Sequence, residues 1–152
     1  MAAIFGTQTF PKFDAFHAHC AMTVTFKTES CLQLFDTFKD SVETWHPEPK
    51  AGGSYKMWDA TEEEYMWVTR TTPKAKYVDD IDFTFTGNAD DFQAKGCTVK
   101  ARSRSQSLSY YDYDTNYCNM WNVFNTQKEQ GEITTSDCKW IPKDAATQCA
   151  KY

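Results

Sequence analysis

The sequence predicts an α+β fold in which an antiparallel β-sheet meander wraps around one amphipathic helix, as in helix-grip and cystatin-like folds. Three observations favour this class: several segments alternate apolar and polar residues, one long segment has a helical period, and the order is strand, helix, four strands, short helix, tail. A lipocalin-like barrel ranks lower, because its first strand would be followed by another strand.

The chain length of 152 residues is typical of one domain. We therefore expect a single domain over 1–152, with an irregular lead-in at 1–18 and a disulfide-stapled tail at 132–152. Aromatic residues make up 16% of the chain, with 11 Phe, 8 Tyr and 5 Trp. The expected core is therefore built largely from rings.

The first two regular elements are a strand over 20–27 and a helix over 28–45. In the strand, Met22, Val24 and Phe26 alternate with the polar residues Thr23, Thr25 and Lys27. In the helix, Ser30 and Gln33 have the spacing of a capping box, and prolines follow the last turn. The apolar residues at helical spacing are Cys31, Leu34, Phe35, Phe38, Val42 and Trp45. Such a helix has one apolar face, and we expect that face to pack on a sheet.

Four more strands are expected after this helix. Their ranges are 54–58 and 64–70, which read as a hairpin, and 77–86 and 97–105, which a polar loop at 87–96 connects. The helix should lie across the concave face of this sheet. We expect Phe35, Phe38 and Trp45 to face Phe83, Phe85, Trp67 and Tyr55.

The strands 77–86 and 97–105 carry opposite charges at alternating positions. If they form a hairpin, Asp80 and Asp82 share a face with Arg102 and Arg104. We therefore expect structural ion pairs between these carboxylates and guanidiniums across the strands. An anion site at the two arginines is the alternative.

A second short helix is expected over 114–126, after a segment that carries four tyrosines between Tyr110 and Tyr117. Asp114 or Thr115 would cap it. The residues expected to be buried are Cys118, Trp121 and either Val123 or Phe124. The tail begins with a short strand candidate at Glu132.

Six cysteines favour disulfides and an oxidising extracytoplasmic compartment, either secreted or an organelle lumen, because no Cys-x-x-Cys pair typical of zinc or redox sites occurs. They are Cys20, Cys31, Cys97, Cys118, Cys138 and Cys149. We expect at least two bridges, and Cys138–Cys149 is the preferred pair. The first residues lack a charged start and a long apolar run, so we expect a mature chain without a signal peptide.

The net charge of −5 and the lack of a basic block argue against nucleic acid as a partner. No run of about 18 apolar residues occurs, so no transmembrane segment is expected.

Four short motifs between Thr69 and Trp121 have a characteristic spacing. They are Thr69-Arg70 with Pro73, Asp79-Asp80-Ile81-Asp82-Phe83, Arg102-Ser103-Arg104-Ser105, and Asp112 with Asn116 at the start of a helix. With these motifs about a third of the chain resembles a widespread family catalogued only as a domain of unknown function. The resemblance supports the fold and implies no activity.

No pattern of a nucleophile paired with a base is present, so we expect a protein without enzymatic activity or cofactor. Asp112, Asp114 and Asn116 have the spacing of the first three ligands of a calcium loop. The Gly and the Glu that this loop needs at its sixth and twelfth positions are replaced by Tyr117 and Val123. Turn formation and helix capping explain the three residues better than a metal does.

The aromatic excess is the remaining indication of function. The candidate ligand-binding residues are Tyr55, Trp67, Tyr110, Tyr111, Tyr113, Tyr117 and Trp121. We expect a non-enzymatic binding module for a small apolar or aromatic ligand, such as a lipid or pigment. Two alternatives stay open: an assembly subunit whose aromatic patch meets a protein partner or another copy of the chain, and an enzyme without a recognisable motif. A competing interpretation of the aromatic excess is that these rings only fill the core.

Overall fold

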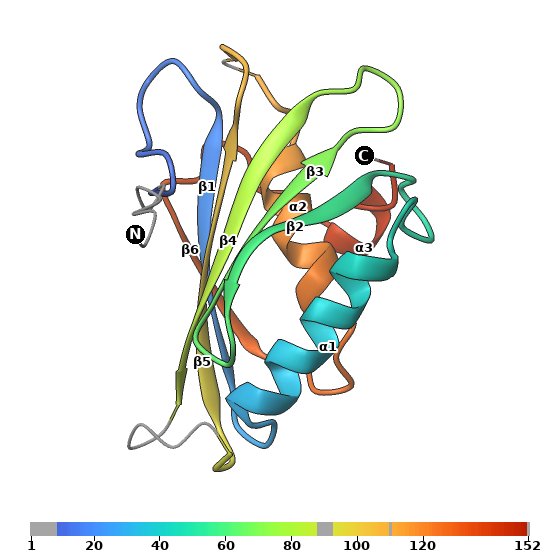
Figure 1. Ribbon diagram of the computed structural model, residues 1–152. Helices are drawn as coiled ribbons and strands as arrows, with labels where there is room; N and C mark the ends of the chain where they lie inside the picture. Colours follow the sequence, from blue (N-terminus) through green and yellow to red (C-terminus); the bar gives the residue numbers. More distant parts are fainter. Residues whose placement is uncertain (1–8, 88–92, 110, 152) are drawn as a thin grey trace, which may run out of the picture.

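A computed structural model describes residues 9–87, 93–109 and 111–151. Its six-stranded antiparallel sheet has the order β2-β3-β4-β5-β1-β6, and the helices lie together on one face of the sheet (Figure 1). The strands are β1 His19–Phe26, β2 Ser54–Thr61, β3 Tyr65–Thr71, β4 Val78–Gly87, β5 Cys97–Ser105 and β6 Glu132–Ser136. The helices are α1 Cys31–Thr44, α2 Thr115–Phe124 and α3 Ala145–Gln148. The α+β class and the antiparallel sheet are confirmed.

Helix α1 begins with the expected capping box. The Ser30 side chain accepts a hydrogen bond from the backbone N of Gln33 at 3.2 Å, and the Gln33 side chain accepts one from the backbone N of Ser30 at 2.9 Å. Two of the backbone donors that a helix start leaves unpaired are thereby satisfied. The face of α1 that meets the sheet consists of Cys31, Leu34, Phe35, Phe38 and Val42.

The core between α1, α2 and the sheet is a cluster of rings. Phe38 is fully buried, and its ring lies 5.6 Å from Phe83, 5.7 Å from Phe85 and 5.4 Å from Phe124. Phe35 packs edge-on against Phe85. Burial of each such side chain stabilises the fold by about 1.5–3 kcal/mol.

Trp67 lies on the opposite face of the sheet from the one expected. Its neighbours in β3, Met66 and Val68, are the residues that enter the core, and a strand alternates its faces. Trp45 packs instead against Tyr55, with the two rings 5.4 Å apart. The expectation that Trp67 faces α1 was therefore wrong, because the residues on either side of Trp67 are the ones that face the helices.

Three disulfides join the described cysteines, and the expected Cys138–Cys149 pair is wrong. The bridges are Cys20–Cys138, Cys31–Cys97 and Cys118–Cys149. The tail is bridged to the rest of the fold at two points instead of to itself. Strand β6 pairs with β1, so Cys138 lies beside Cys20, whereas Cys149 follows α3, which packs against α2.

Helix α2 starts one residue later than expected and takes its cap from a different carboxylate. Asp114 has a left-handed backbone (φ 71°) and its side chain makes no cap hydrogen bond. Asp112 Oδ2 instead accepts from the backbone N of Asn116 at 3.0 Å. The left-handed turn at Tyr113 and Asp114 brings Asp112 back over the helix start.

Within the described residues, no helix has the length and apolar character needed to cross a membrane.

Candidate functional site

A buried guanidinium at the end of β3 is the centre of a polar network between the sheet and α2. Arg70 has no exposed surface. Its Nε donates to Glu48 Oε2 at 3.0 Å and its Nη2 to Glu48 Oε1 at 2.9 Å, while Nη1 donates to Asn119 Oδ1 at 3.0 Å. Burial raises the pKa of the Glu48 carboxyl, and the hydrogen bonds from Arg70 oppose that rise. Such a two-point pair fixes both partners in orientation.

Asn119 carries the network on from Arg70 to the neighbouring strands. Its Nδ2 donates to Asp79 Oδ2 at 2.7 Å and to Ser103 Oγ at 3.1 Å. Ser103 Oγ in turn donates to Asn116 Oδ1 at 2.7 Å. Four polar side chains from β4, β5 and α2 are therefore joined within the protein interior, where unpaired polar groups would be costly.

Asn116 extends the network to the start of α2. Its Nδ2 donates to Asp112 Oδ2 at 2.8 Å and to Ser105 Oγ at 3.2 Å. The other carboxylate oxygen, Asp112 Oδ1, is buried and has no hydrogen-bond partner in the described part of the chain. One carboxylate in this network therefore has unused acceptor capacity.

The four motifs picked out in the sequence meet in this network. The motif residues that take part are Arg70, Asp79, Ser103, Ser105, Asp112 and Asn116. Three further members, Glu48, Asn119 and Asn122, lie outside the motifs; Asn122 Nδ2 donates to Glu48 Oε1 at 3.1 Å. Asn119 follows Asn116 by three residues and so lies on the same helix face. This second amide on that face is the sequence feature that could have identified Asn119 as a member of the network. Nothing in the sequence around Glu48 distinguished it.

A cavity of about 360 Å³ borders the network where β4 begins and β5 ends. Asp79 and Asp112 both line it. Asp79 is only 2% exposed; burial raises the pKa of its carboxyl, and the nearby charge of Asp112 adds to that rise. The apolar lining residues are Pro73, Ala75, Tyr77, Val78, Leu108, Tyr111 and Tyr113, and Lys74 and Lys151 also contribute. The cavity thus combines apolar walls with two carboxyl groups.

Two of the predicted ligand-binding residues line this cavity. Tyr111 and Tyr113 are 59% and 68% exposed, and their rings stack with centroids 6.4 Å apart. Tyr111 also contacts the ring of Trp140 at 5.6 Å. Tyr110 lies outside the described residues.

The other predicted ligand-binding residues are elsewhere. Tyr55 is fully buried and its hydroxyl donates to the backbone O of Asn119 at 2.8 Å. Tyr117 is buried on α2, and Trp67 is on the face of the sheet away from the helices. Trp121 lines a second cavity of about 150 Å³, which Glu48 also borders. The sequence grouped these rings because they are close along the chain or chemically alike, whereas the fold separates them.

One of the predicted charge pairs between β4 and β5 forms on the face of the sheet opposite the helices, and the other does not. Asp82 lies opposite Arg102 in the strand register, and Arg102 forms an ion pair with it through Nε at 3.0 Å and through Nη2. Asp80 lies opposite Arg104 but accepts instead from Trp67 Nε1 at 3.0 Å. Because Arg102 already holds a carboxylate in two-point contact, this geometry does not favour an anion site there.

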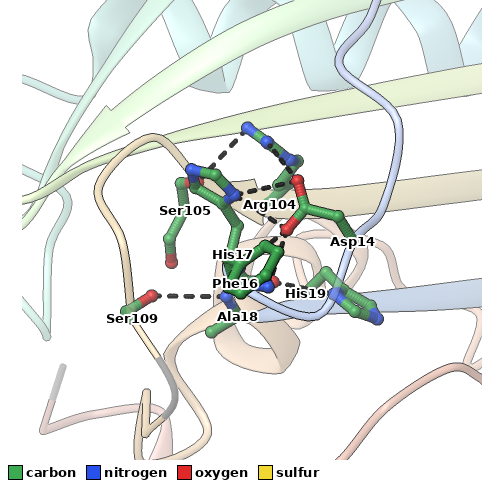
Figure 2. A network of polar contacts seen from close by, with 8 residues as sticks. All are labelled: Asp14, Phe16, His17, Ala18, His19, Arg104, Ser105 and Ser109. Carbon is green, nitrogen blue, oxygen red and sulfur yellow. Dashed lines mark hydrogen bonds and ion pairs between the residues drawn. The ribbon is translucent and has the colours of Figure 1, made fainter.

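Arg104 pairs with Asp14, a residue of the lead-in, at 3.1 Å (Figure 2). The same carboxylate accepts from the backbone N of Phe16 at 2.8 Å and contacts Nδ1 of His17 at 2.8 Å. The hydrogen bond with His17 holds the pKa of Asp14 well below its usual range. His19 makes a separate contact, to the backbone O of His17. These contacts attach the lead-in to the sheet.

The predicted weak metal candidates do not form a shared ligand set. The Asn116 side-chain oxygen accepts from Ser103, and Asp112 Oδ2 is held by Asn116. Among the described residues no group of three or more His, Cys, Asp or Glu is arranged to hold a metal ion.

A protein-family model matches most of the chain. The family model described as "Protein of unknown function (DUF1499)" matches residues 16–124, which are 109 of the 152 residues. No curated protein matches the chain. The matched range includes β1 to β5, α1, α2 and every member of the Arg70 network, and leaves β6 and α3 outside. The chain therefore belongs to the DUF1499 family of proteins of unknown function.

Proposed function

We propose that the protein is a non-enzymatic binding module that holds a small apolar or aromatic ligand in the cavity between the start of β4 and the start of α2. The observation that carries this proposal is the cavity itself, about 360 Å³ with mostly apolar walls. Ligand sites typically measure roughly 300–1,000 Å³ and combine such walls with a few polar groups.

The exposed rings at the cavity support a ligand over a purely structural role. Tyr77 is 60% exposed and Leu108 is 78% exposed, and both line the cavity with Tyr111 and Tyr113. Large apolar side chains that gather around one concavity mark a binding surface more often than isolated ones do. The Arg70 network behind the cavity holds the polar lining residues in fixed positions, which lowers the entropy cost of binding.

The compartment that we propose is extracytoplasmic, either secreted or an organelle lumen. Three disulfides support it, because such bridges persist in oxidising surroundings and are rare where thiols are kept reduced.

Titration of ¹⁵N-labelled protein with 2-phenylethanol tests the proposal. This neutral probe has an aromatic body and one hydroxyl. We expect saturable amide shift changes confined to the cavity lining. A filled cavity should lose the probe: Ser107→Trp places a ring at an exposed lining position, whereas Gln106→Trp places the same ring at an exposed neighbour outside the lining. We expect at least about tenfold weaker binding in the first variant, since most apolar contact is lost, and unchanged binding in the second.

Absence of saturable shifts at millimolar probe, or equal weakening in both variants, would refute the cavity as the binding site.

A second candidate function is assembly through the surface beside the cavity. Trp140 is 37% exposed and packs on Tyr111 there, and Ile141, the next residue in the chain, is 52% exposed. Aromatic side chains of this kind are enriched at protein interfaces. Sedimentation at several concentrations distinguishes the two: self-assembly requires a mass that rises with concentration.

A further inference from the structure

We infer that the cavity selects ligands that carry a protonated amine, with the ammonium group near Asp79 and Asp112 and the apolar body toward the tyrosines. This inference rests on the proposed function and names the chemical class of its ligand.

The charges of the network give the first argument. Its members include three carboxyl groups, on Glu48, Asp79 and Asp112, and one guanidinium. Arg70 directs two donors at Glu48 and a third at the neutral amide of Asn119. Asp79 and Asp112, which line the cavity, do not share this two-point contact, although the charge of Arg70 also acts on Asp79 and opposes the rise of its pKa. A second cation beside these carboxyl groups would stabilise them further.

The unused hydrogen-bonding capacity gives the second argument. Asp112 Oδ1 is buried without a partner in the described part of the chain, and an ionised carboxylate oxygen only accepts. A donor is therefore needed there. An ammonium group offers three donors and a positive charge, and so meets both requirements. A ligand carboxylate or phosphate supplies neither, and would approach two groups of its own charge.

The charged residues of the cavity also differ in their exposure to solvent. Lys74 and Lys151 are exposed, whereas Asp79 is buried and Asp112 is half-buried. The carboxyl groups therefore attract the part of a ligand that lies beside them through a medium of low dielectric. The lysines interact with the solvent-facing part of the ligand through water. Coulomb energies are several times larger in the first setting than in the second.

Three probes with nearly the same body test the inference: phenethylamine, 2-phenylethanol and 3-phenylpropionate, each titrated by NMR at pH 7. We expect the amine to bind at least about tenfold more tightly than the alcohol, because a hydrogen bond between an ammonium group and a carboxylate is stronger than one from a neutral hydroxyl. The acid should bind most weakly. Asp112→Asn should weaken the amine about tenfold and change the alcohol by less than about threefold.

The control for removal of a negative charge is Asp36→Asn, at an exposed position of α1. It should leave all three affinities unchanged. Because Asp112 also caps α2, Asp79→Asn serves as the second variant, and thermal melts establish that each variant is folded. The order in which the wild-type protein binds the three probes tests the inference without any variant.

Each outcome decides between the claims. Equal affinity of the three probes, or tightest binding of the acid, overturns the amine inference and leaves the proposed binding function intact. No binding of any probe overturns both. Weakening of the amine by Asp36→Asn to the same extent as by Asp112→Asn would mean that overall charge, not the cavity, attracts the amine, and that also overturns the inference.

Discussion

Replacement of Arg70 by Met should destabilise the fold more than any surface change. The guanidinium is fully buried and makes hydrogen bonds of 2.9–3.0 Å to Glu48 and Asn119. Arg70→Met keeps much of the side-chain volume but leaves the Glu48 carboxylate, which is 4% exposed, without its cation. Removal of one partner of a buried pair costs about 3–5 kcal/mol, a large part of the roughly 5–15 kcal/mol that stabilises a typical domain.

The matched control removes both charges. Arg70→Met with Glu48→Met leaves no buried ion behind, and the exchange of a buried pair for apolar residues is often neutral or stabilising. We therefore expect the double variant to be at least about 2 kcal/mol more stable than Arg70→Met alone. The assay is equilibrium unfolding in guanidinium chloride with the disulfides intact, compared at constant slope so that midpoint shifts report stability.

The destabilisation caused by Arg70→Met should depend on pH in a definite direction. Burial already raises the folded-state pKa of Glu48 above its ordinary value of 4.5, and loss of Arg70 should raise it further. A raised folded-state pKa means that the folded state binds the proton more tightly than the unfolded state. Its stabilising contribution is complete below pH 4.5 and is lost as pH rises through the folded-state pKa. The Arg70→Met penalty should therefore be smaller at pH 4 than at pH 7.

A cost below about 1 kcal/mol at pH 7, or a double variant no more stable than Arg70→Met alone, would refute the account of a buried, paired guanidinium.

Three further predictions concern other parts of the fold. Gly53→Ala should cost roughly 1–3 kcal/mol in the same unfolding assay, because a Cβ there would lie 2.5 Å from Nε of the fixed Arg70 side chain; an unchanged midpoint would contradict this. Replacement of Cys20 and Cys138 by Ala should cost about 2–5 kcal/mol, and peptide mapping of the wild type should recover this bridge rather than one between Cys138 and Cys149. Glu129 accepts from the Thr28 hydroxyl at 2.7 Å and from the backbone N of Lys27 at 2.7 Å, and these hydrogen bonds lower its pKa to about 2. Its stabilising effect is therefore present above pH 4.5 and is lost as pH falls toward 2, so the melting temperatures of the wild type and Glu129→Gln should converge over that window.

The sequence predicted the elements whose signals are local. The period of 31–45 and the spacing of Ser30 and Gln33 indicated α1 and its cap, because a helix start must satisfy its own backbone donors nearby. The alternation in 77–86 and 97–105 likewise indicated two strands in antiparallel register. In the segment 64–70 the same alternation separates Trp67 from Met66 and Val68, and the prediction placed Trp67 on the wrong face.

The partners brought together by topology were not predictable from the sequence. Nothing in the tail indicates that β6 pairs with β1, so the Cys20–Cys138 bridge was missed. The contact of Glu48 with Arg70 joins residues 22 positions apart across two elements. Four motifs of the resemblance did contain most of the network, but only the fold shows that they meet at one cavity.

The cavity of about 360 Å³ lies beside the start of α2 and not in the middle of the fold. The rings of Phe38, Phe83 and Phe124 occupy the space in the middle of the fold. Tyr111 and Tyr113 were identified as candidates because four tyrosines in eight residues are difficult to bury together. The free-energy cost of burying them indicates that some are exposed, but it does not predict where in the fold they lie.

The most direct measurement of the central claim is a set of intermolecular NOEs between 2-phenylethanol and the protein at saturating probe. The proposed site predicts NOEs from the probe's ring protons to Tyr111, Tyr113 and Leu108, which line the cavity. NOEs confined to Phe10 and Trp67, which pack together on the opposite face of the sheet, or no NOEs at all, would contradict it.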